Sequence, residues 1–92
     1  KSEIPVLVDF GASWCGPCRQ MEPAVAYLSV QYKDRVKVGK VDVDESPSVT
    51  SAHKIDAYPT LVLFRDGEEI ARAVGGMSYR SLSAWVDEHT AK

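Results

Sequence analysis

The chain has 92 residues, with 13 acidic and 11 basic side chains and a formal net charge of −2. This length predicts one domain over residues 1–92, and the composition is ordinary for a globular protein. The nearly balanced charge excludes an electrostatic case for binding nucleic acid or an anionic membrane. No apolar run approaches the roughly 18 residues that a membrane-spanning helix needs.

The apolar pattern predicts strands and helices in alternation. In chain order the expected elements are a strand at 4–10, a helix at 17–32, a strand at 36–43, a short helix at 46–53, strands at 60–64 and 69–74, and a helix from 78. Pro23 lies inside the first helix and predicts a kink there. Ser46 and Ser78 are expected N-caps, and Asp66-Gly67 is a strong hairpin signal.

These elements together predict an α/β fold. Two strands separated by a helix favour a parallel βαβ unit, whereas strands joined by Asp-Gly favour an antiparallel pair. We therefore expect a mixed sheet with helices on its faces.

The only two cysteines stand together in Cys15-Gly16-Pro17-Cys18, where a buried strand gives way to a helix. Free N–H groups and the helix dipole favour a thiolate at such a position, and the thiolate is the reactive nucleophile. Two intervening residues let one helical turn bring the second sulfur within bonding reach. The spacing predicts a dithiol that cycles with a small-ring disulfide.

Two other interpretations of the cysteine pair are weaker. Tetrahedral zinc needs four ligands, and only His53 and His89 are further candidates, so we expect no metal site. A purely structural disulfide that closes so short a loop would stabilise the fold little.

Four segments resemble thioredoxin: VLVDFGASWCGPC at 6–18, VDVD at 41–44, YPTLVLFRDG at 58–67 and VGG at 74–76. The resemblance implies a thioredoxin fold with a mixed four-stranded sheet flanked by three helices, lacking the family's usual first strand and helix. The edge at residues 36–43 would then be exposed or covered by a neighbouring chain, and an exposed edge invites pairing.

The resemblance also implies roles for single residues. Cys15 matches the exposed attacking cysteine, Cys18 the buried resolving cysteine, and Pro59 the cis-proline that faces the disulfide. The residues expected to bind a target are Trp14, Gly16, Pro17, Tyr58, Thr60, Val74 and Gly75.

Two charged residues interrupt apolar strands. Asp9 stands in the first strand, where a lone buried carboxylate is costly and is expected to be protonated or partnered. Lys40 stands in the neighbouring strand. The resemblance implies that Asp9 exchanges a proton with Cys18 and that Lys40 modulates the pKa of Cys18. The alternative for Lys40 is that it extends to solvent and pairs with a surface acid.

Two residues depart from the family pattern. Gly11 replaces a bulky side chain, often Trp, so the floor beside the cysteines is expected to be less shielded or filled by another side chain. Tyr58 precedes Pro59 where an aliphatic residue or Met is usual, which is expected to change which substrates fit.

The function implied is a thioredoxin-type reductase of protein disulfides, with no bound cofactor beyond the Cys15–Cys18 disulfide. Its implied partners are disulfide-containing proteins and a thioredoxin reductase, and we expect a cytoplasmic monomer that could pair at its open edge.

Two alternatives stay open. One is a disulfide oxidase or isomerase, which Gly16-Pro17 argues against. The other is a non-catalytic module of a larger assembly, which the retained cysteine pair argues against.

Overall fold

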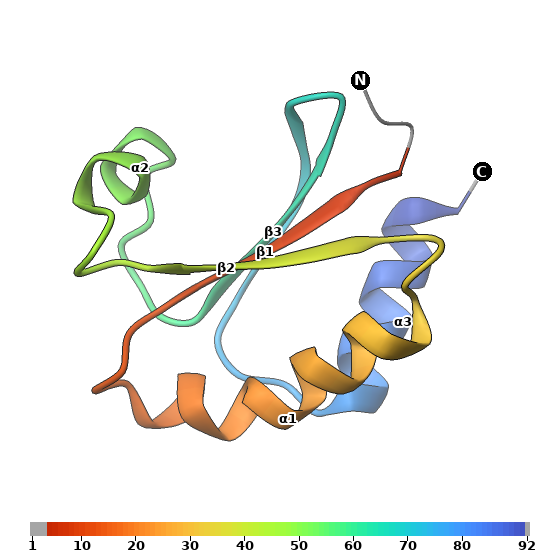
Figure 1. The fold of residues 1–92 in the computed structure, drawn as a ribbon, viewed down its shortest axis with the longest axis horizontal. Coiled ribbons are helices and arrows are strands. Elements are labelled where there is room, and N and C mark those ends of the chain that lie inside the picture. The colour runs from red at the N-terminus through yellow and green to blue at the C-terminus, as the bar shows by residue number, and fades with distance from the viewer. Residues whose placement is uncertain (1–3, 92) are drawn as a thin grey trace.

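The computed structural model describes residues 4–91 (Figure 1). Its elements are β1 (Val6–Gly11), α1 (Gly16–Gln31), β2 (Lys37–Asp42), α2 (Pro47–Ala52), β3 (Thr60–Arg65), β4 (Glu68–Val74) and α3 (Tyr79–Thr90). The predicted order is confirmed, and each boundary lies within about two residues of the expected one, the usual uncertainty of element ends.

The strands form one mixed sheet in the order β2-β1-β3-β4. β1 pairs with β2 in parallel and with β3 antiparallel, and β3 pairs antiparallel with β4. Asp66 and Gly67 both have positive φ, 55° and 83°, as a two-residue hairpin turn requires. Between residues 4 and 91 no strand lies outside β2, so this edge is open there, as expected.

Side chains alternate across β1, and this alternation places the later site. Leu7 belongs to a core that includes Leu28 of α1 and Leu82 of α3. Phe10 belongs to a second apolar cluster on the opposite side. Figure 1 shows α1 and α3 along one face of the sheet and α2 beyond the other. Asp9 has the parity of Leu7, so it points toward α1.

The helix ends agree with the sequence patterns except at Ser46. The Ser78 hydroxyl accepts a hydrogen bond from Ser81 N–H at 3.2 Å and so caps α3. Ser46 occupies the N-cap position of α2, but its side chain makes no capping bond. Its carbonyl instead accepts hydrogen bonds from both the N–H and the hydroxyl of Thr50. Pro23 lies within the continuous helix α1. No helix in the described part of the chain is suited to spanning a membrane.

Candidate active site

The two cysteines lie at the start of α1 and are joined by a disulfide. Cys15 is the N-cap residue, and its sulfur accepts a hydrogen bond from Cys18 N–H at 3.2 Å. The two Cα atoms are 5.3 Å apart. The backbone N–H of Cys15 donates to Ala12 O at 3.1 Å, which closes the turn that leaves β1. The helix start thus offers an N–H donor to the sulfur that would carry negative charge after reduction.

Both cysteines are equally buried, which corrects the expectation that Cys15 is the exposed one. Each side chain is only 6% exposed. The reason is that both sulfurs belong to the second apolar cluster, which includes Phe10 of β1 and Ile55. In the disulfide form the two cysteines therefore differ in their neighbours rather than in their exposure.

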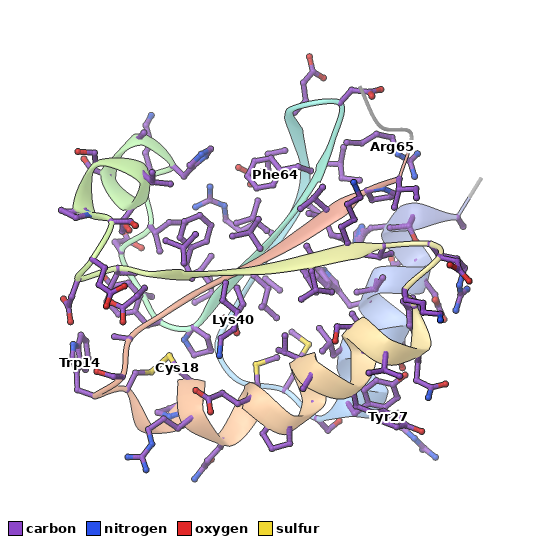
Figure 2. All side chains as sticks on the ribbon, viewed as in Figure 1. Trp14, Cys18, Tyr27, Lys40, Phe64 and Arg65 are labelled. Carbon is purple, nitrogen blue, oxygen red and sulfur yellow. A yellow bond between two sulfur atoms is a disulfide. The ribbon has the colours of Figure 1, made fainter. Side chains whose placement is uncertain are left out.

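An aromatic pair lies beside Cys15. The Trp14 side chain is 63% exposed, and its indole N–H donates to Asp44 Oδ2 at 2.7 Å. The Tyr58 ring meets the Trp14 ring edge to face, with 5.8 Å between centroids and an interplanar angle of 84°. Figure 2 shows Trp14 at the end of the molecule where Cys18 lies. Three loops, carrying Trp14, Asp44 and Tyr58, are therefore linked around the cysteine pair.

Pro59 follows a cis peptide bond from Tyr58, as the resemblance implied. Its carbonyl accepts a hydrogen bond from Gly75 N–H at 2.8 Å, and Gly75 has a φ of 98°, a conformation that favours glycine. Val74 is exposed next to it. Gly16 and Pro17 are also exposed.

Thr60 does not present its side chain to a target, which corrects its expected place in the binding surface. The residue is 1% exposed, and its hydroxyl donates to Ala57 O at 2.6 Å. A buried hydroxyl needs such a partner, because leaving it unpaired is costly. Thr60 therefore stabilises the turn that leads into Pro59.

Asp9 is a buried carboxylic acid beneath this surface. It is 3% exposed, and its Oδ1 has no hydrogen-bond partner among residues 4–91. Burial raises the pKa of Asp9 above its ordinary value of 3.8; the charge of Lys40 lowers this pKa, and the charge of Glu22 raises it further. The group is thus held toward its protonated form, as a proton carrier near neutral pH requires.

Lys40 lies opposite Asp9 in the β1–β2 register, but its ammonium group is directed elsewhere. Lys40 Nζ lies 3.5 Å from Glu22 Oε2, and both side chains are more than half exposed. Figure 2 shows Lys40 projecting from β2 toward α1. The alternative interpretation of Lys40 is therefore confirmed, because it pairs with a surface acid, while its charge also acts on Asp9; its influence on Cys18 stays a prediction.

Glu22 was not among the residues singled out in the sequence. A signal was present, because Glu22 follows Cys18 by four residues and so lies one helical turn further along the same face. That position places Glu22 beside the cysteine pair once the helix is known.

A cavity of about 280 Å³ opens beside the disulfide. Its lining includes Asp9, Gly11, Cys18, Glu22 and Lys40. A Cβ atom built on Gly11 would lie 3.2 Å from Cys18 Sγ and 3.8 Å from Asp9 Oδ1. The missing side chain at Gly11 therefore leaves the floor less shielded, which was one of its two expected consequences.

The two histidines are packing residues. His53 lies between the rings of Phe10 and Phe64, at centroid distances of 5.9 and 5.3 Å, and His89 packs on Trp85. Between residues 4 and 91 no three His, Cys, Asp or Glu side chains gather in a way that would hold a metal ion.

Comparison with known proteins matches the sequence of this chain to a family. The family model for thioredoxin matches residues 1–88. Thioredoxin 1 of Synechococcus elongatus is 48% identical over 89 residues, which cover 97% of this chain and 83% of that protein. Thioredoxin 1 of a Nostoc species is 43% identical, and thioredoxin of Rickettsia felis 40%, each over 96% of this chain and over 82% and 84% of their own length. With its Cys15–Cys18 disulfide at the start of α1, the chain belongs to the thioredoxin family and is a thiol–disulfide oxidoreductase.

Proposed function

We propose that residues 1–92 act as one thioredoxin domain that reduces protein disulfides through Cys15 and Cys18. The observation that carries this proposal is the position of the disulfide, with the Cys15 sulfur at the N-cap of α1 and Cys18 above a buried acid. The family supports disulfide-containing proteins as substrates in general.

The exchange proceeds in two steps. The Cys15 thiolate attacks one sulfur of a target disulfide, the target S–S bond breaks, and the other target sulfur leaves and takes up a proton. Cys18 then loses its proton and attacks Cys15. The mixed disulfide breaks, and the released target sulfur takes up a proton from solvent. The target leaves as a dithiol, and two electrons have passed to it from Cys15 and Cys18, which end as a disulfide.

Asp9 is the proposed proton acceptor for Cys18 in the second step. The point where a Gly11 Cβ would stand is within 4 Å of both Cys18 Sγ and Asp9 Oδ1, so the two groups face one small space. An acid that burial holds toward its protonated form is a stronger base than an exposed carboxylate once it ionises. Lys40 modulates this exchange through its charge.

Targets would dock on the surface formed by Trp14, Gly16, Pro17, Tyr58, Val74 and Gly75, with Pro59 beneath it. This surface has exposed apolar groups and few charges, which suits the extended segments of many proteins. The Tyr58 ring packs against the Trp14 ring on this surface, so the aromatic pair is expected to favour some targets over others.

Recycling would use a thioredoxin reductase that draws on NADPH and returns two electrons and two protons to the disulfide. The domain itself would work as a monomer without a bound cofactor. We place it in the cytoplasm because Gly16-Pro17 resembles the reducing members of the family and the cytosol keeps dithiols reduced.

The test is reduction of insulin disulfides by the chain with a dithiol reductant. Cys15→Ser is expected to abolish turnover, whereas Cys18→Ser is expected to stop after the first step and accumulate a mixed disulfide visible by mass spectrometry. Ser48→Ala, an exposed substitution on α2, is the matched control and should turn over normally. Equal turnover in all three variants would refute the mechanism.

A further inference from the structure

Glu22 lines the same cavity as Asp9 and Cys18, and its side chain is more than half exposed. We propose that Glu22 is a positioning residue that sets the protonation of Asp9 by holding the Lys40 ammonium group away from it. The inference rests on the proposed role of Asp9 as the proton acceptor for Cys18, and it adds a surface residue that controls this buried acid.

The geometry of three charged groups carries the inference. Lys40 is the β2 residue paired with Asp9 in the strand register, so its side chain starts beside the carboxylate. Its Nζ nevertheless ends 3.5 Å from Glu22 Oε2, while Asp9 Oδ1 has no hydrogen-bond partner in the part of the chain that the structure describes. A lysine ammonium group is a point charge on a flexible stem, so two carboxylates on either side compete for it. In this structure Glu22 holds it.

Within residues 4–91, the other groups around Asp9 offer no equivalent partner. The neighbouring residue on β3 in the register is Leu61, which is apolar. Asp42 and Glu45 also line the cavity, but Asp42 Oδ1 accepts hydrogen bonds from the backbone N–H groups of Asp44 and Glu45. Cys18 Sγ is tied in the disulfide.

Gly11 contributes to this arrangement, because it has no side chain to occupy the space that Asp9 and Cys18 both face. The point where its Cβ would stand lies within 4 Å of both Asp9 Oδ1 and Cys18 Sγ. The cavity is large enough to hold water, which can carry a proton between polar groups that line it. The buried acid is thus connected to the surface along the side where Glu22 and Lys40 stand.

Removing the Glu22 charge should act on Asp9 in two ways that have the same sign. The negative charge of Glu22 raises the pKa of Asp9, and the positive charge of Lys40 lowers it. In Glu22→Gln the first influence disappears and Lys40 is released to approach Asp9. Both changes favour the ionised carboxylate.

The experiment follows the Asp9 carboxyl carbon by NMR in oxidised protein labelled with ¹³C-aspartate. The variants are Glu22→Gln, Lys40→Gln and the double variant, with Glu88→Gln as the matched control, since Glu88 is exposed on α3 and does not line the cavity. The Asp9 titration midpoint is expected to move to lower pH in Glu22→Gln, to higher pH in Lys40→Gln, and not at all in Glu88→Gln. Because Glu22 acts largely through Lys40, Glu22→Gln should shift the Asp9 midpoint less in the Lys40→Gln background than in the wild-type background.

The second measurement is the pH profile of the Cys18 attack on a preformed Cys15–peptide mixed disulfide. At pH values below the midpoint, Glu22→Gln is expected to react about two- to fivefold faster, the range that weakly coupled exposed charges produce. An Asp9 titration midpoint in Glu22→Gln that coincides with the midpoint in Glu88→Gln would overturn the inference. So would an unchanged Glu22 effect in the Lys40→Gln background.

Asp9→Asn separates this inference from the proposed function. If Asp9→Asn leaves the pH profile unchanged, Asp9 is not the proton acceptor, and the inference falls with that role. If Asp9→Asn removes the pH dependence while Glu22→Gln leaves the NMR midpoint in place, the acceptor role stands and only the control by Glu22 is refuted.

Discussion

The buried carboxyl of Asp9 should lower the unfolding free energy at neutral pH, and Asp9→Asn should raise it again. Asp9 is 3% exposed, and no described residue forms a hydrogen bond with its Oδ1. Asparagine keeps the shape and cannot ionise. The variant therefore avoids the cost of ionising a buried group, and at pH 8 its unfolding free energy should be larger by about 1.4 kcal/mol for each unit by which burial raises the pKa of Asp9.

The sign of the pH dependence follows from the raised pKa of Asp9. Below the ordinary value of 3.8 the carboxyl is protonated in both states, so there is no cost of ionisation. As the pH rises above that value, the unfolded chain releases its proton first, so the fold loses stability until the pH passes the higher pKa of the folded state. Each unit of difference between the two pKa values corresponds to about 1.4 kcal/mol.

The assay is urea unfolding of the oxidised wild type and Asp9→Asn at several pH values from 4 to 9. The difference in unfolding free energy should be small at pH 4, grow with pH and then level off. Asp34→Asn, the same change at an exposed position, should differ from the wild type by no more than about 0.5 kcal/mol. A gain that does not vary with pH, or a loss of stability at pH 8, would refute the reasoning.

Three further predictions test the core, the turn and the docking surface. Leu82→Ala removes a fully buried side chain of α3 and should lower the unfolding free energy by about 2–5 kcal/mol in urea; a loss under 1 kcal/mol would contradict the packing. Gly67→Ala requires an alanine to adopt a φ of 83° and should lower the unfolding free energy by about 1–2 kcal/mol, measured by thermal unfolding. The control Gly39→Ala places a Cβ that meets nothing within 4 Å and should lower it far less. Equal losses in the two variants would rule out backbone strain at the turn. Tyr58→Leu removes the ring that meets Trp14 and should lower kcat/KM for insulin by about two- to tenfold, and an unchanged kcat/KM would exclude Tyr58 from docking.

The sequence predicted most of the fold because each element carries its own local signal. The apolar run of β1, the Asp66-Gly67 turn and the Ser78 cap depend on neighbours in the chain, and the structure confirms them. The cysteine pair was equally clear, since its spacing and its place before a helix are both local.

The parts of the site that were missed depend on side chains that meet only in three dimensions. Thr60 is buried because it begins β3, which lies between β1 and β4 in the sheet, and its hydroxyl is satisfied by Ala57 O three residues earlier. The expectation that the strand of Lys40 lies beside the strand of Asp9 is confirmed. The partner of Lys40, Glu22, comes from a helix whose rotation about its own axis the sequence did not determine. Equal burial of Cys15 and Cys18 likewise follows from the apolar cluster around both sulfurs.

The hydrogen bond from Gly75 to Pro59 limits how a target chain can be held. Each backbone amide has one proton to donate, and that of Gly75 is already given to the Pro59 carbonyl. An arriving segment must therefore take its main-chain bonds from other groups at the rim. Since such bonds do not depend on the target's sequence, discrimination between targets falls to the side chains that flank the reactive cysteine, where Trp14 and Tyr58 stand.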